Sequence, residues 1–308
     1  MSCLLGRGQW LLGYRVFRDG GENRMPALFL SRIRVYPIKA CAGTDVQQAH
    51  TNARGLQYDR RWVLVDEQGR DLHQFDYPRL SGVVVSLVAD GFLVQAPGMS
   101  RLQVPLQPQT SPLLKVQWFQ GACEALLASD QADRWFQTFL HVPCHLVYMP
   151  ELAQHLVEPG YGDGHDLAAF TSFHYHLLGE GSLHDLNQRL EKPVPVERFR
   201  PNLVIGGTSA FEEDSWRILQ INQLTFQVVK PCDRCAITTV DPVTDVMTGK
   251  EPLTTLARYR TFDHKVLFGH YLLSRETGVL HVGDAVQVME YQSGAETAEG
   301  DGSSLVSG

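Results

Sequence analysis

The sequence predicts an α+β protein dominated by β-strands, with two barrel-like parts in one chain. Many short runs rich in β-branched and aromatic residues are separated by turn residues, whereas only three segments have the spacing of a helix. The length of 308 residues corresponds to two domains of about 150 residues each. The chain contains neither a repeat of fixed period nor a heptad pattern.

The composition is that of a globular protein with a sizeable core, since 44% of the residues are hydrophobic and 20% are charged. Asp and Glu (34) outnumber Lys and Arg (27), so the net charge of -7 predicts no nucleic-acid partner but leaves room for a local basic cluster. No apolar run reaches the roughly 18 residues that a membrane span needs. The six cysteines are too sparse for a disulfide framework.

In the first half, strands are predicted at short apolar runs bounded by turn residues. Ser129 is expected to cap a helix, because the apolar residues from Ala132 to Phe139 lie on one helical face. The predicted strands cover residues 28–36, 61–72 (a hairpin turning at Gln68-Gly69), 83–88 and 92–95 (a hairpin turning at Asp90-Gly91), 114–118 and 144–149.

The second half opens with a glycine-rich loop at residues 160–164. Ser182 is expected to cap a helix that Pro193 ends, and a second short helix is expected at 252–259 after a proline. Strands are predicted at residues 202–205, 218–221 and 224–230, with two closing hairpin strands around 277–278 and 282–284.

The two ends of the chain differ from the rest. Residues 1–26 contain a weak apolar stretch without the continuous core of a secretory signal, so we expect a non-globular extension, with Met25 as a plausible start. Residues 293–308 are small, polar and acidic and are expected to be a disordered tail. With no signal identified, we expect a cytoplasmic location; import into an organelle stays open.

The motif Cys232-Asp-Arg-Cys235 allows several interpretations. It could be half of a zinc site, although no second cysteine pair lies at suitable spacing, or a redox pair, although it precedes a strand-like segment at residues 236–240 where that chemistry needs a helix. A single thiolate could instead bind a soft metal, with Arg234 favouring its charged form. Buried thiols with no chemical role are an equally strong interpretation.

Other polar residues are suggestive on their own. Arg200 and Asn202 stand at the head of an expected strand, where a guanidinium can hold a carboxylate or phosphate. Lys39 and Arg60 also lie at element ends, where a lone cation is most often a solvated surface charge. The pair His174 and His176 could bind a metal from one strand face, but an exposed polar face is the favoured interpretation.

Longer motifs resemble a known family. The blocks Cys232-Asp-Arg-Cys-Ala-Ile-Thr-Thr-Val-Asp-Pro and Lys250-Glu-Pro-Leu-Thr-Thr-Leu-Ala-Arg-Tyr-Arg260 resemble the MOSC domain, as do Arg198-Phe-Arg-Pro-Asn202 and Phe211-Glu-Glu-Asp-Ser-Trp216. The motifs Val35-Tyr-Pro-Ile-Lys39 and Gly55-Leu-Gln-Tyr-Asp-Arg60 resemble its N-terminal β-barrel partner domain. The resemblance implies a barrel-like domain at 27–148 and a MOSC domain with a few helices at 149–292. The two-part form is similar to the amidoxime-reducing components and their bacterial relatives.

This resemblance implies a molybdenum-pyranopterin cofactor. Cys235 falls on the family's molybdenum-ligating cysteine, whereas Cys232 does not; Arg200 and Asn202 match positions that hold the pterin and its phosphate; Lys39 and Arg60 match basic cofactor contacts. The implied function is a molybdenum-dependent oxidoreductase that reduces small N-hydroxylated compounds. The chain has no cysteine after Cys235, so no iron–sulfur cluster is expected. Electrons would come from a separate protein of the ferredoxin, flavoprotein or cytochrome b5 type.

The sequence departs from the family pattern at three places near the implied site. Ala40 replaces a common serine, Phe75 replaces a common arginine, and the loop after Phe170 reads Thr-Ser-Phe-His-Tyr-His. Two alternative functions therefore stay open beside the reductase. One is a sulfur-carrier or sulfurtransferase role in cofactor maturation, with a pyridoxal-phosphate desulfurase as partner. The other is a non-catalytic module that binds the cofactor.

Overall fold

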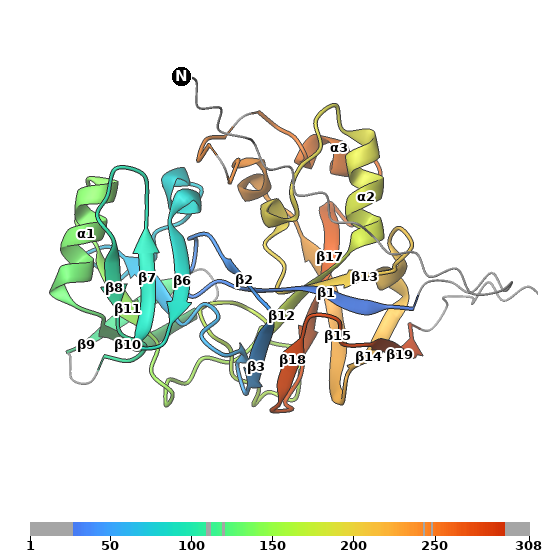
Figure 1. Ribbon diagram of the computed structural model, residues 1–308, viewed down its shortest axis with the longest axis horizontal. Helices are drawn as coiled ribbons and strands as arrows, with labels where there is room; N and C mark the ends of the chain where they lie inside the picture. The colour runs from blue at the N-terminus through green and yellow to red at the C-terminus, as the bar shows by residue number, and fades with distance from the viewer. Residues whose placement is uncertain (1–26, 109–111, 119–120, 243, 248, 293–308) are drawn as a thin grey trace, which may run out of the picture.

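The computed structural model describes residues 27–108, 112–118, 121–242, 244–247 and 249–292 (Figure 1). The expected N-terminal extension and C-terminal tail lie outside these residues. Strands dominate the described part, and its three α-helices are short, so the predicted β-dominated fold class is confirmed. Among the described residues, no helix is long and apolar enough to span a membrane.

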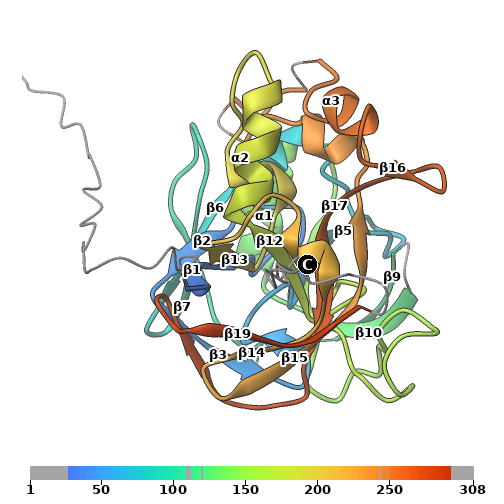
Figure 2. The same cartoon turned by 90° about the vertical axis from the view of Figure 1, so that its right-hand side faces the viewer.

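The largest sheet has nine strands, and eight follow the order β19-β14-β15-β17-β12-β13-β1-β2 while β16 pairs with β17. All neighbours are antiparallel except β12 and β13, which run parallel. The sheet curls beneath α2 (Glu180–Arg189) and α3 (Leu253–Ala257) (Figure 2). Its strands are β1 (Phe29–Val35), β2 (Thr44–Val46), β12 (Tyr175–Gly179), β13 (Leu203–Gly206), β14 (Trp216–Ile221), β15 (Leu224–Asp233), β16 (Thr261–Phe262), β17 (Lys265–Leu273) and β19 (Val286–Tyr291).

The smaller lobe of the molecule contains a four-stranded sheet of order β5-β11-β10-β9 and a three-stranded sheet of order β6-β7-β8. We call these two sheets with α1 the first lobe, and the nine-stranded sheet with α2 and α3 the second lobe (Figure 1). The first-lobe elements are β5 (Trp62–Val65), η1 (Pro78–Gly82), β6 (Val84–Val88), β7 (Gly91–Gln95), β8 (Leu102–Val104), β9 (Leu113–Trp118), β10 (Gly121–Leu127), α1 (Asp130–Leu140) and β11 (His145–Tyr148).

The first strands of the chain belong in space to the second lobe. β1 pairs with β13, and β3 (Gln48–Asn52) pairs with β18 (Val279–His281) and with β4 (Gly55–Leu56). Leu30, Ile33 and Val35 of β1 are buried in the same apolar core as Phe226 of β15. The domain boundary near residue 149 stays a prediction about the sequence, whereas in space β1 to β4 lie with strands from the other half.

The two helices that serine was predicted to cap behave differently. The hydroxyl of Ser129 accepts a hydrogen bond from the Ala132 amide at 3.1 Å, so the predicted cap of α1 is confirmed. α2 (Glu180–Arg189) begins before Ser182, so the predicted cap there is wrong. Ser182 is fully buried, and its hydroxyl donates to the Glu213 carboxylate at 2.8 Å. This tertiary bond between α2 and η3 (Glu212–Ser215) takes the hydroxyl that a cap would use.

Further differences from the sequence prediction concern strand pairing. Beyond the turn at Gln68-Gly69, only an isolated bridge joins Val65 to Asp71, so the second strand of that hairpin is absent there. The closing strands β18 and β19 pair with β3 and β14, not with each other. β17 and β10 were not predicted, and β17 occupies the centre of the large sheet.

Candidate functional site

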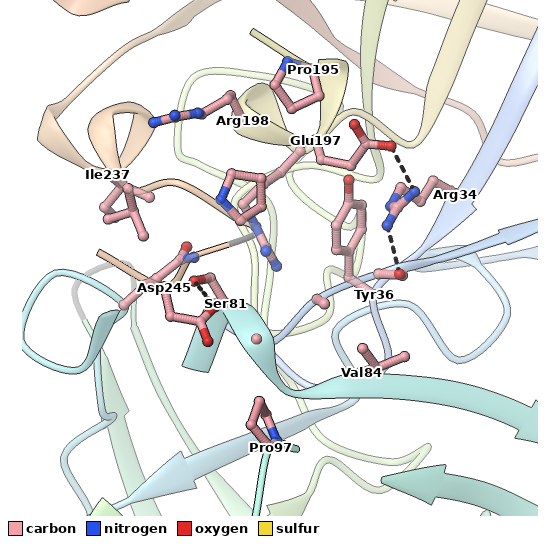
Figure 3. A pocket seen from close by; sticks show the side chains of 17 residues that line it. Arg34, Tyr36, Ser81, Val84, Pro97, Pro195, Glu197, Arg198, Ile237 and Asp245 are labelled. Atoms are coloured by element: carbon pink, nitrogen blue, oxygen red, sulfur yellow. Dashed lines mark hydrogen bonds and ion pairs between the residues drawn. The ribbon is translucent and has the colours of Figure 1, made fainter. Parts of the chain in front are cut away.

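Three cavities meet in the cleft between the lobes, and Arg200 and Ile237 line all three. The thiol cavity, which contains Cys235, has a volume of about 210 Å³. The lysine cavity, which contains Lys39, has a volume of about 170 Å³. The inter-lobe cavity is the largest of the three, at about 420 Å³, and it is lined from both lobes (Figure 3).

Cys235 lies where the long strand β15 gives way to η4 (Ala236–Thr239). The predicted strand at residues 236–240 is therefore wrong, because these residues form a 3₁₀ turn. The Thr238 and Thr239 hydroxyls donate to the carbonyls of Cys235 and Ala236, each three residues back, which favours the turn over a strand. The turn leaves the Cys235 side chain exposed at the cavity wall.

The two cysteines of the motif have opposite surroundings. Cys232 is 3% exposed, and burial raises the pKa of its thiol, so it stays protonated near neutral pH. Cys235 is exposed. Among the residues that the structure describes, no group of three or more His, Cys, Asp or Glu side chains could hold a metal ion. The geometry thus separates one reachable thiol from one buried thiol.

Arg234, between the cysteines, is fixed by hydrogen bonds to the backbone. Its Nε donates to the Phe268 carbonyl at 2.8 Å, its Nη1 donates to the Phe199 carbonyl at 2.9 Å, and its Nη2 contacts Nε2 of His176. Burial lowers the pKa of His176 well below its usual value, so the neutral ring accepts from the guanidinium. Gly269 permits this contact, since a Cβ there would lie 2.6 Å from the imidazole Nε2. Arg234 therefore anchors the loop that carries Cys235.

The favoured interpretation of the histidine pair as an exposed polar face is wrong. His174 is 1% exposed and His176 is 5% exposed, because β12 lies in the middle of the large sheet. Nε2 of His174 bonds the Leu167 carbonyl at 2.8 Å, and Nδ1 bonds the backbone of Ser274. Both nitrogens of His174 are thus engaged with the backbone.

Arg60, Arg200 and Asn202 are brought together although they come from different halves of the chain. Nη1 of Arg60 donates to the Asn202 side-chain carbonyl at 2.7 Å, and its Nη2 donates to the Arg200 backbone carbonyl at 3.2 Å. Both guanidinium carbons lie over the ring of Tyr36, at 4.3 Å for Arg60 and 4.4 Å for Arg200. Such contacts stabilise cations in a poorly hydrated site.

The cations of the cleft differ in their counter-charges. Nζ of Lys39 lies 2.8 Å from an Asp71 oxygen, and Nη1 of Arg60 lies 2.5 Å from an Asp59 oxygen. Arg200 has no carboxylate partner among the described residues. Burial lowers its pKa to about 10, so it remains charged at neutral pH. Of the three predicted cations, Arg200 alone has no carboxylate within ion-pair distance among the described residues, although Asp59 raises its pKa from farther away.

The structure places all five predicted residues in adjoining cavities. Cys235, Arg60, Arg200 and Asn202 line the thiol cavity, and Lys39 lines the lysine cavity, which also includes Arg60 and Arg200. Reasoning from the sequence missed Tyr36, and it considered His176 only as a metal ligand or an exposed polar residue, not as a contact of Arg234. Tyr36 stands inside the motif Val35-Tyr-Pro-Ile-Lys39, which is the signal that could have identified it. The contact of His176 with Arg234 has no local signal, because 58 positions separate them.

Comparison with known proteins finds two family models in the chain and relatives that match most of its length. The family model described as MOSC domain matches residues 164–287, and the model described as MOSC N-terminal beta barrel domain matches residues 27–143. Mitochondrial amidoxime reducing component 2 of Rattus norvegicus is 34% identical over 280 residues, covering 84% of this chain and 83% of the relative. Mitochondrial amidoxime-reducing component 1 of Homo sapiens is 33% identical over 280 residues, covering 84% and 82%.

Proposed function

The chain belongs to the MOSC family together with the amidoxime-reducing components, and from this premise we propose that it is a molybdenum-dependent reductase of N-hydroxylated compounds. The proposal includes a molybdenum-pyranopterin cofactor and a separate electron-donor protein. The observation that carries it is the reachable thiol of Cys235 in one cavity with the unpaired guanidinium of Arg200. A soft thiolate and an uncompensated cation are the two groups that a metal with a phosphate-bearing organic ligand requires.

In this proposal Cys235 supplies the single protein thiolate to molybdenum. When bound, the cofactor supplies the two-electron chemistry, and the protein supplies binding and orientation. Arg234 holds the loop that presents the thiol, through its bonds to Phe268 and Phe199 and its contact with His176. The buried Cys232 has no part in metal binding, because its thiol stays protonated and covered.

Arg200 is proposed as the main contact to the cofactor phosphate. Bringing an anion to an unpaired, partly desolvated guanidinium removes the cost of leaving that charge without a counter-ion. Arg60 and Lys39 contribute less charge, because Asp59 and Asp71 already neutralise them. Asn202 orients Arg60 through the 2.7 Å bond from Nη1 of the arginine to the amide oxygen.

The substrate class rests on the names of the relatives and on chemical balance. Reduction of an amidoxime consumes two electrons and two protons, breaks the N–O bond, and yields an amidine and water. We propose that the two electrons arrive from the separate donor protein. The relatives are named mitochondrial, and for this chain the cytoplasmic location stays a prediction from the sequence.

The proposal is tested by turnover of benzamidoxime with a chemically reduced viologen dye as electron donor. We expect benzamidine to form in proportion to the molybdenum bound by the preparation, and no product in samples without the dye. A matched pair of variants, Cys235→Ala and Cys232→Ala, controls for the loss of a thiol. A molybdenum-loaded protein that forms no benzamidine would contradict the reductase.

The same preparation distinguishes the sulfur-carrier alternative. A persulfide on Cys235, detected by mass spectrometry in protein without molybdenum, would favour sulfur transfer over reduction. This outcome uses the same exposed thiol but requires no metal.

A further inference from the structure

The inter-lobe cavity is not explained by the proposed roles of the cleft residues. Its volume of about 420 Å³ is twice that of the thiol cavity, and it lies within the usual range of small-molecule sites, which begins at roughly 300 Å³. Figure 3 shows that segments from both lobes surround it, with Val84 and Pro97 on one side and Pro195 and Ile237 on the other.

The walls of this cavity are mainly apolar and stiff. Val84, Pro97, Pro195, Val240 and Pro242 all line it. Proline presents ring carbons and no backbone N–H, so these surfaces offer contact to hydrocarbon without leaving donors unsatisfied. Such walls favour a ligand with a compact apolar body.

Most charges at the cavity are already paired. Nη1 of Arg34 lies 2.8 Å from Asp45 and 3.1 Å from Glu197, and Nη2 of Arg198 lies 2.9 Å from Asp241. Asp245 accepts a hydrogen bond from the Ser81 hydroxyl at 3.1 Å, on the side of the cavity away from Arg34 (Figure 3). The ion pairs of Arg34 and Arg198 stabilise the walls, whereas the Asp245 carboxylate has no cation within ion-pair distance among the described residues.

Besides the buried Nε atoms of Arg34 and Arg198, which have no hydrogen-bond partner among the described residues, two further groups at the cavity keep donors to spare. Arg200 has five N–H donors, and its one hydrogen bond among the described residues goes from Nη1 to the Cys41 carbonyl at 2.8 Å. Gln74 is only 7% exposed, and its amide has no hydrogen-bond partner among the described residues. Both also line the lysine cavity, so they lie where the cavities adjoin. A carboxylate there would satisfy both donors.

We infer that the inter-lobe cavity binds a small organic monoanion, with its carboxylate at Arg200 and Gln74 and its apolar body against the valine and proline walls. The remaining donors of Arg200 are enough for this carboxylate and for a phosphate on the lysine-cavity side. The inference requires no metal, but it shares Arg200 with the proposed phosphate contact, so the benzoate site is tested on metal-free protein.

The probe for this site is benzoate, titrated calorimetrically into the purified full chain, with benzamide as its uncharged match. We expect saturable binding of one benzoate per chain and at least tenfold weaker binding of benzamide. Val84→Trp should abolish benzoate binding by filling the cavity. Val88→Trp is the matched control, because it lies on the same strand and has similar exposure (36% against 44%) but lines none of the cavities described here.

A second variant, Gln74→Leu, removes the amide without adding bulk and should weaken benzoate binding several-fold. Circular dichroism checks that each variant remains folded. Non-saturating benzoate binding, equal binding of benzamide, or unchanged affinity in a folded Val84→Trp would each overturn the site. Molybdenum content, measured in loaded preparations of the same variants, reports separately on the proposed function.

Discussion

The two lobes place different kinds of cation in the cleft between them. Lys39 and Arg60, beside β5 of the first lobe, are each held by a carboxylate, Asp71 and Asp59. Arg200, at the head of β13 in the second lobe, has no such partner among the described residues. A cation that is already paired stabilises the fold, whereas an unpaired buried cation costs stability unless a ligand compensates it. From this difference we expect an anion to bind chiefly to the second lobe.

The same contrast extends to the thiols. Cys41 and Cys144 of the first half are buried, and burial raises the pKa of each to about 12, so both are inert near neutral pH. Cys235 of the second lobe is exposed. Cys123 of β10 is partly exposed, but burial raises its pKa to about 11, so Cys235 of the second lobe is the fully exposed thiol among the described residues.

The largest expected effect comes from replacing one paired cation, Lys39, and one unpaired cation, Arg200, by methionine. Lys39→Met leaves the buried Asp71 carboxylate with only the His73 imidazole, at 3.2 Å, and should lower the free energy of unfolding by about 3 kcal/mol. Arg200→Met removes a buried charge with no counter-ion, so the metal-free protein should be no less stable than the parent. Urea unfolding of metal-free protein measures both.

Cofactor retention should depend more on Arg200 than on Lys39, the opposite of the order expected for stability. Arg200→Met should reduce bound molybdenum at least tenfold, whereas the double variant Lys39→Met/Asp71→Asn, which removes the whole pair, should retain most of it. Equal losses in both variants would contradict the division of roles between the lobes.

The next effect concerns pH and the second lobe. Burial lowers the pKa of His270 to about 4, from a usual value of 6.5. The unfolded chain binds a proton at His270 more readily than the folded protein does. The free energy of unfolding is therefore highest above pH 6.5 and decreases as the pH falls toward 4. The loss amounts to roughly 3 kcal/mol. The slope of unfolding free energy against pH in this window should be reduced in His270→Gln; an unchanged slope would show that other groups govern the acid response.

The smallest effects compare the two serines at the helix starts. Ser182→Ala leaves the buried Glu213 carboxylate without one of its donors and should cost about 2 kcal/mol. Ser129→Ala removes the cap of α1 and should cost about 1 kcal/mol. Thermal unfolding of both variants under one condition measures the difference, and a larger loss in Ser129→Ala would reverse the assigned roles.

Local patterns in the sequence predicted the elements that local chemistry determines. The apolar strand ending at Pro37 and the cap at Ser129 depend on neighbouring residues, and both are present. Ser182 was misassigned because its partner, Glu213, lies 31 positions away. The strand after Cys235 was misassigned because threonine hydroxyls can also bond the backbone of a turn.

Site residues that belong to a sequence motif could be predicted, whereas contacts between residues far apart in the sequence could not. Cys235, Arg200 and Asn202 stand in motifs, and the structure places them along one cavity. The bond from Arg60 to Asn202 spans 142 positions, and the pairing of Lys39 with Asp71 spans 32. No local pattern in the sequence indicates which cation pairs with a carboxylate. This pairing leaves Arg200, and not Arg60, able to bind an anionic ligand.

The assignment of Cys235 is tested most directly by the molybdenum bound per chain in two single variants. Cys235→Ala and Cys232→Ala remove the same atoms three positions apart, one from an exposed side chain and one from a buried one. We predict that Cys232→Ala retains molybdenum at the level of the parent and that Cys235→Ala loses it. Parental molybdenum in Cys235→Ala would contradict the account.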